Sequence, residues 1–216
     1  MKRSSLSSIL REKVEPLEYR YNDDRAEWSW TQVEPDQWAA VELDDRYTIF
    51  SRLGIGARSA TVTMRLDWLG YTGNFDKQAL TLHNALRWRG QHLFLTSIVD
   101  DRRAGRLDVK AALVETTVID AKPKERTGRD ELNRPTVETV GPFRFTGVIT
   151  EIYRGNNPRE VYYEETIRHA LVTPKPIVLK AGDIVQVVAG RRYVVREVHD
   201  LDPYKNEYAI EAEADV

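Results

Sequence analysis

Two copies of one hairpin pattern constrain the fold of this chain more than any other feature. In each copy a glycine opens a β-rich run, an aspartate closes it, and a second β-rich run follows. The glycines are Gly90 and Gly190, 100 residues apart, and the aspartates are Asp100 and Asp200. Because a repeat of this length matches a whole small domain, the sequence predicts two related β modules in series. The second runs are Leu107–Val114 and Glu207–Ala212.

The size and composition suit such a pair of modules. A chain of 216 residues allows two domains of about 100 residues each, and a hydrophobic content of 41% supplies two cores. The net charge of −2 gives no overall attraction to nucleic acid or to an anionic membrane. With no cysteine, a disulfide framework, thiolate catalysis and cysteine-ligated zinc are excluded, which fits synthesis in a reducing cytoplasm. With no signal peptide and no apolar run of about 18 residues, we expect a soluble protein.

Short β-rich segments separated by glycine, proline and asparagine recur along the chain. Apolar and polar residues alternate from Ser59 to Trp68, and Trp28 and Trp30 also lie two residues apart, as in half-buried strands. Helix patterns are nearly absent. The sequence therefore predicts an all-β protein made of two small SH3-like barrels or sandwiches, with long loops.

Four segments follow from these patterns. Residues 1–13 have apolar residues at helical spacing and predict a short N-terminal arm. Residues 14–118 form the first β module and residues 141–216 the second. Between them, residues 119–140 are poor in apolar residues and predict a solvated linker or a long loop. Basic residues in that stretch leave a contact with nucleic acid open, although its acidic residues dilute the positive charge.

The sequence shows no recognisable catalytic constellation. Its histidines lack metal-ligand spacing, and no phosphate-binding glycine loop is present. The adjacent aspartate pairs 23/24, 44/45 and 100/101 are explained better as turn residues than as catalytic carboxylates. We therefore expect no enzyme activity, no metal and no cofactor, with a small hydrolase as the least favoured alternative.

Arginines gather near both hairpins, and two interpretations of them are open. They lie near a phosphate backbone or an acidic partner, or they are solvated hairpin residues neutralised by nearby carboxylates. The candidates for DNA-channel or partner contacts are Arg87, Arg89, Arg102, Arg103, Arg106, Arg191, Arg192 and Arg196.

Several short motifs follow one another in the first module, over about residues 14–116. They are Trp30, Trp38-Ala39-Ala40-Val41-Glu42, Thr61–Leu66, Leu86–Ile98 and Arg106–Glu115. In this order they resemble the head-closure or head–tail joining proteins of long-tailed bacteriophages. The chain lacks the usual Arg-Ile start, and Arg58–Asp67 stands where a His-Arg-Ile strand is more common.

A second set of motifs occurs over about residues 141–213. It comprises Phe145-Thr146-Gly147-Val148, Tyr162–Leu171, Leu179-Lys180-Ala181-Gly182-Asp183-Ile184-Val185 and Gly190–Val198. With these motifs the second module resembles the tail-attachment or neck proteins of lambda-like phages. Its Gly-Asp-x-Val and Gly-x-x-Tyr-x-Val segments also occur in SH3-like barrels that are unrelated to phages.

The resemblance implies a virion protein of the head–tail neck, made in the host cytoplasm. Such proteins form a homo-oligomeric ring between the portal or its adaptor and the tail terminator or tail tube, and packaged DNA passes through the channel. No membrane partner is implied. The alternative function is a nucleic-acid-binding protein with tandem SH3-like barrels.

Overall fold

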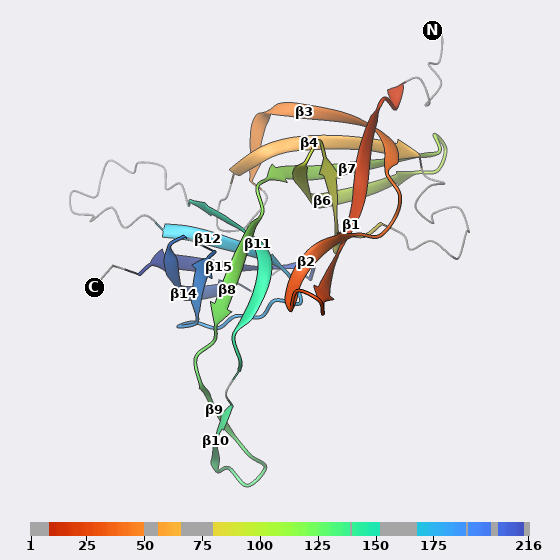
Figure 1. Cartoon of the computed structure of the whole chain (residues 1–216). Coiled ribbons are helices and arrows are strands. Elements are labelled where there is room, and N and C mark those ends of the chain that lie inside the picture. Colours follow the sequence, from red (N-terminus) through yellow and green to blue (C-terminus); the bar gives the residue numbers. More distant parts are fainter. Residues whose placement is uncertain are drawn as a thin grey trace, which may run out of the picture. The chain divides into compact units, whose positions relative to one another are not determined.

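A computed structural model of the chain (Figure 1) describes residues 9–49, 56–65, 80–138, 140–151, 168–188, 190–199 and 203–213. These residues form an all-β fold, as predicted, and group into two compact units. The first unit holds most of the described residues up to Glu115, and the second holds those from Thr116 onward. The segment Tyr21–Ser29 groups with the second unit.

The first unit contains a closed antiparallel barrel. Around the barrel the strand order is β1-β3-β4-β7-β6-β5, and β5 pairs back with β1 to close the ring. Closure satisfies backbone groups that an open sheet would leave exposed at its edges. The six described strands are β1 (Glu12–Asn22), β3 (Gln37–Ile49), β4 (Gly56–Arg65), β5 (Asn84–Trp88), β6 (Gln91–Asp101) and β7 (Arg106–Val114).

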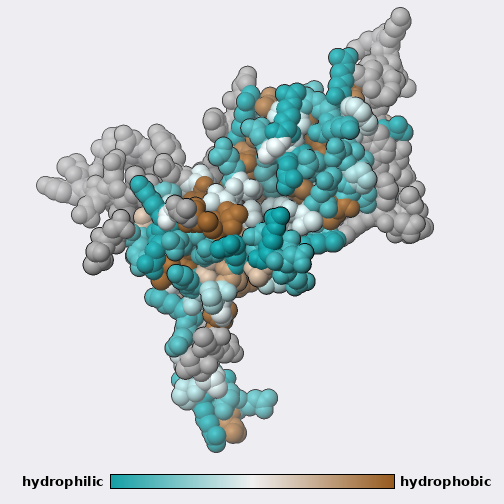
Figure 2. Space-filling model, in the orientation of Figure 1, coloured by the Kyte–Doolittle hydropathy of each residue, from teal (hydrophilic) through white to brown (hydrophobic). Residues whose placement is uncertain are grey.

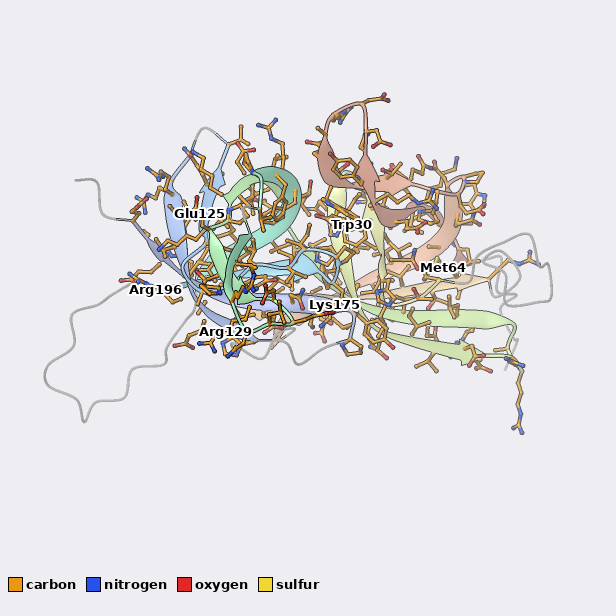
Figure 3. All side chains as sticks on the ribbon, turned by 90° about the horizontal axis from the view of Figure 1, so that it is seen from below. Trp30, Met64, Glu125, Arg129, Lys175 and Arg196 are labelled. Atoms are coloured by element: carbon orange, nitrogen blue, oxygen red, sulfur yellow. The ribbon has the colours of Figure 1, made fainter. Side chains whose placement is uncertain are left out.

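The alternation noted in the sequence places the first core. On β4, Ala60, Val62 and Met64 are fully buried, whereas Thr61 and Thr63 between them are half-buried on the opposite face. Figure 3 labels Met64, which belongs to the hydrophobic core of this barrel together with buried residues of β6 and β7. Period-two patterning therefore fixes which face of the strand is inside.

The second unit contains a second closed antiparallel barrel. The order is β8-β11-β12-β15-β14-β13, and β13 pairs back with β8. Its core includes the fully buried side chains of Ile119, Phe145, Leu171 and Tyr208. The six described strands are β8 (Thr117–Lys122), β11 (Phe143–Glu151), β12 (Arg168–Pro174), β13 (Ile184–Val187), β14 (Arg192–His199) and β15 (Lys205–Ala212).

The two barrels share one topology. Taken in chain order, the first, second and third barrel strands are neighbours, the fourth, fifth and sixth are neighbours, and the ring closes in the same way in both units. The repeated hairpins correspond to β5–β6 and β13–β14. The register of β6 against β7 shifts between Leu95 and Ser97, and that of β14 against β15 shifts between Val195 and Glu197. A bulge thus occurs at the same place in both repeats, 100 residues apart.

Each barrel carries an insertion between its first and second strands. In the first case it is β2 (Glu27–Gln32), whose Glu27 and Trp28 pair in parallel with β11 and so belong to the second unit. In the second case it is a separate two-stranded hairpin, β9 (Arg126–Arg129) and β10 (Pro135–Glu138). Figure 1 shows this hairpin continuing away from the second barrel beyond the end of β8. We refer to residues 124–138 as the arm.

Three expectations from the sequence require correction. The linker expected over 119–140 is instead the barrel strand β8 followed by the arm, because Ile119 and Ala121 are fully buried in the second core. Asp44 and Asp45 lie within β3, where the register against β4 is irregular, and not in a turn. Asp100 and Asp101 are the last residues of β6, although the Asp101 side chain accepts a hydrogen bond from the Ala104 N–H of the following turn at 3.0 Å. Of the N-terminal arm expected over 1–13, residues 1–8 lie outside the described part, and Glu12 and Lys13 already belong to β1. Two further predicted stretches, 66–68 and 162–167, also lie outside it.

Candidate interaction surface

The base of the arm is fixed to the second barrel by a buried carboxylate. Asp183 is 1% exposed, and its Oδ1 and Oδ2 accept hydrogen bonds from the backbone N–H groups of Lys124 (3.0 Å) and Lys180 (2.8 Å). Gly182, at φ +89°, turns the chain directly before it. The Gly-Asp motif singled out in the sequence therefore holds the point where the arm leaves the barrel.

The tip of the arm has a defined structure of its own. The Asp130 carboxylate accepts hydrogen bonds from the backbone N–H groups of Leu132 (2.9 Å) and Arg134 (2.8 Å). Asn133 adopts a left-handed conformation at φ +61°, and its side-chain oxygen accepts a hydrogen bond from Arg129 at 2.8 Å. Asparagine tolerates this conformation better than most residues. The tip is therefore shaped by local bonds, without a barrel beneath it.

This ordered tip presents a hydrophobic side chain to solvent. Leu132 is 70% exposed, the largest exposure among the large hydrophobic residues described. Figure 2 shows a hydrophobic patch at the far end of the arm, surrounded by hydrophilic surface. Figure 3 labels two residues of the arm, Glu125 near its base and Arg129 next to its tip. The arm holds four basic and four acidic residues, so its charges cancel. A neutral arm with an apolar end suits a protein surface better than a phosphate backbone.

Most of the candidate arginines of the first unit are neutralised within that unit. Arg87 and Arg89 pair with Glu15 (2.9 Å) and Glu12 (3.1 Å), at the end of the barrel where β5 turns into β6. Arg102 and Arg106 lie at the other end of β6, so the structure separates the candidates into two groups. Their partners are Asp100 (3.1 Å) for Arg102, and Asp101 (3.7 Å) and Asp108 (3.0 Å) for Arg106.

Two of the three candidate arginines of the second unit are also paired with carboxylates. Arg192 pairs with Glu213 at 3.2 Å and Arg196 with Glu211 at 2.6 Å. Figure 3 shows Arg196 on the outside of the second barrel. Each of these pairs is exposed, so each contributes at most about 1 kcal/mol to stability, but each lowers the positive charge that the arginine offers to a phosphate.

Arg103 and Arg191 differ from the other six candidates. Both are exposed in turns, and no ion pair joins either of them to a described residue. Each follows an exposed valine in the sequence: Val99, 56% exposed, lies in β6 four residues before Arg103, and Val188, 46% exposed, lies in the β13–β14 turn three residues before Arg191. The described residues therefore include two arginines that have no ion pair with a described residue and that lie close in sequence to an exposed valine.

The tryptophans divide between core and surface. Trp88 is 7% exposed and belongs to the first core, whereas Trp38 on β3 is 47% exposed. The ammonium of Lys13 lies 5.5 Å from the Trp38 ring centroid. Trp68 lies outside the described residues. Because exposed tryptophan is enriched at protein–protein contacts, Trp38 adds a second candidate contact on the first unit.

The buried histidine of the first barrel is a packing residue. The His92 ring packs against Trp30, with ring centroids 5.0 Å apart and the planes tilted by 52°, and lies next to Phe94. Burial, with a smaller contribution from the charge of Arg87, lowers the pKa of His92 to about 3. Its imidazole is therefore neutral at ordinary pH. Within the described residues, no three His, Cys, Asp or Glu side chains gather into a group that could hold a metal ion.

Sequence reasoning missed several residues that shape the second unit. The Tyr208 hydroxyl donates to the Ile177 carbonyl (2.8 Å) and accepts from the Leu179 N–H (3.1 Å), while Asn206 donates to the Ile177 carbonyl (2.8 Å). These bonds hold the segment before Asp183 against the barrel. The one signal in the sequence is a tyrosine and an asparagine amid the β-rich run of the last strand.

Comparisons with family models, with curated proteins and with solved structures found no match for this chain. None of the helical residues described forms a segment long and apolar enough to cross a membrane.

Proposed function

We propose that this chain is a non-enzymatic connector in the neck of a tailed phage. It closes the DNA-filled head and joins the portal or adaptor to the tail terminator or tail tube, as one subunit of a homo-oligomeric ring. The observation that carries this proposal is the duplicated closed barrel with an ordered, apolar-tipped arm projecting from the second copy.

Closed barrels with projecting elements suit a connector on physical grounds. In a closed barrel the strands pair around the ring, which gives a rigid body with few exposed edges. Loops and hairpins then reach neighbouring subunits. A ring of identical subunits needs two different surfaces on each subunit, and a projecting arm supplies one of them. Many weak contacts around the ring reinforce one another.

The surface charges support a protein partner more than nucleic acid recognition. Six of the eight candidate arginines are paired with carboxylates of their own unit, and the arm is neutral. Packaged DNA passes through the channel of such a ring, so contact with DNA there needs no sequence-reading groove.

A second candidate function is nucleic acid binding by the tandem barrels. The observation that favours it is the absence of an ion-pair partner for Arg103 and Arg191 among the described residues. It predicts an affinity for DNA or RNA that falls steeply with salt and is lost in the Arg191→Ala plus Arg192→Ala variant. No binding at low salt would remove this candidate.

The connector proposal is tested with tailless, DNA-filled heads from the same phage. Heads that lack their neck proteins are incubated with the purified full chain, sedimented, and treated with nuclease. We expect the chain to sediment with the heads and to protect the packaged DNA. A chain that binds neither heads nor isolated portal nor tails would contradict the proposal.

A further inference from the structure

We propose that the arm tip of one copy docks on the β13–β14 turn of the next copy, head to tail. Leu132 packs against Val188, and Glu131 forms an ion pair with Arg191. This contact rests on the proposed ring, for which it supplies one of the subunit interfaces.

The two surfaces lie at opposite ends of the same barrel. The β13–β14 turn is beside the start of β8, where the Val188 N–H donates to the Val118 carbonyl at 3.2 Å. The arm leaves from the other end of β8, where Lys122 pairs with Ile184. The six residues of β8 separate these ends by about 17 Å. The tip lies about 25 Å beyond the base of the arm, since a strand rises about 3.3 Å per residue. An arm directed away from the barrel meets the turn of another copy, not its own.

The arm is prepared for such a contact. Its base is held by Asp183, and its tip is closed by the hydrogen bonds of Asp130. An isolated two-stranded hairpin is only marginally stable in water, so an ordered tip with Leu132 70% exposed gains from a partner. Because the tip already has its shape, little conformational entropy is lost on docking.

The receiving turn matches the tip in chemistry. Val188 is 46% exposed, and the N–H of Gly190 donates to the Val187 carbonyl at 2.8 Å, so the turn is tight. Arg191 in that turn has no ion-pair partner among the described residues, and Glu131 beside Leu132 is exposed. A carboxylate and an apolar side chain on the tip thus face a guanidinium and an apolar side chain on the turn.

The β6–β7 turn of the first unit, which holds Arg103, is a poorer match. Val99 is 56% exposed and Arg103 has no ion pair with a described residue, but Asp100 and Asp101 directly follow Val99. Their carboxylates would repel Glu131. The residues described from Val188 to Arg192 include no acidic side chain, and the neighbouring Glu213 is paired with Arg192 at 3.2 Å, which is why we assign the contact to the β13–β14 turn.

The absence of cysteine from the chain allows a direct test by disulfide trapping. Full-length Leu132→Cys and Val188→Cys chains are mixed, oxidised with diamide and run on a non-reducing gel. We expect a disulfide-linked dimer, and a ladder or closed ring when both changes are in one chain. The matched control replaces Val188→Cys by Val99→Cys, which carries a thiol at a similarly exposed valine. Failure of the Leu132–Val188 pair to cross-link, or equal trapping with Val99→Cys, would overturn the contact.

Charge reversal provides the second part of the test. Glu131→Arg and Arg191→Glu should each weaken self-association about tenfold, and the double variant should restore it. Glu125→Arg, the same change near the base of the arm, should leave association unchanged. Sedimentation of the unaltered chain separates the two proposals. If that chain assembles and neither reversal weakens assembly, the arm contact fails and the ring stands. If the unaltered chain never self-associates, alone or on heads, both fail.

Discussion

At the scale of single residues, His92 makes the stability of the first barrel depend on pH. Its pKa is lowered from 6.5 to about 3, mainly by burial. Between these values the unfolded chain binds a proton that the folded chain does not, so the free energy of unfolding falls by about 1.4 kcal/mol for each pH unit lost. Urea unfolding should show the parent losing about 2 kcal/mol more than His92→Phe between about pH 6 and pH 4.5. His83→Asn, on the exposed turn before β5, is the control and should behave as the parent. Equal losses in the parent and His92→Phe would contradict the assignment.

Asp183 and Asp130 permit a matched comparison of burial. Each carboxylate accepts two backbone N–H groups at similar distances, but Asp183 is 1% exposed and Asp130 is exposed. Asp183→Ala removes the buried acceptor of two part-buried N–H groups, so it should lower the free energy of unfolding of the second barrel by about 2 kcal/mol. Asp130→Ala leaves donors that water reaches, so its cost should stay below about 1 kcal/mol. Chemical denaturation of both variants measures the difference. Similar losses in the free energy of unfolding would contradict the role given to Asp183 at the base of the arm.

At the scale of elements, the two repeat glycines are needed for different reasons. Gly90 adopts φ +78°, where a side chain is strained although the space around it is open, whereas a Cβ on Gly190 would lie 3.0 Å from the Cβ of Val187. At position 90, Asn should be tolerated better than Ala, because Asn accepts a left-handed backbone and Ala loses about 1 kcal/mol there. At position 190 the Ala variant should be more stable than the Asn variant, because the space beside Val187 is limited and Asn has the larger side chain. Thermal unfolding of the four variants, Ala and Asn at each position, measures their order of stability. The same order at both positions would contradict this explanation.

The elements show which parts of the fold the sequence can predict. The strands around Val62 and around both glycines follow from local alternation and turn residues, and they occur where expected. Ring closure rests on long-range pairs such as Leu17 with Ala85, which no local pattern encodes. The sequence pattern wrongly predicts a linker where β8 lies. The reason is that the two buried residues of this strand, Ile119 and Ala121, directly precede a long polar stretch.

The candidate contacts are predictable only in part. All eight arginines are visible in the sequence, and Arg102 and Arg106 pair with aspartates close to them in the chain. The partners of the other four paired arginines come from neighbouring strands, as with Arg87 and Glu15, so the sequence does not show them. The roles of Asp183 and Leu132 depend on burial and on exposure, which the sequence does not state. Arg103 and Arg191 can be told from the other six candidates only in the structure, which shows carboxylate partners for those six.

At the scale of the whole molecule, the chain is one barrel topology used twice, with an insertion at the same point in each copy. The insertions differ: the first contains β2, whose Glu27 and Trp28 group with the second unit, and the second is the arm, which projects from the second barrel. A duplicated scaffold with divergent insertions can present different surfaces to different neighbours, as a joint between two assemblies requires.

The most direct test of this account is electron microscopy of tailless, DNA-filled heads incubated with the purified full chain. The account predicts a ring of added density at the portal vertex, with two barrels in each subunit. Heads whose portal vertex is unchanged at saturating protein would contradict it.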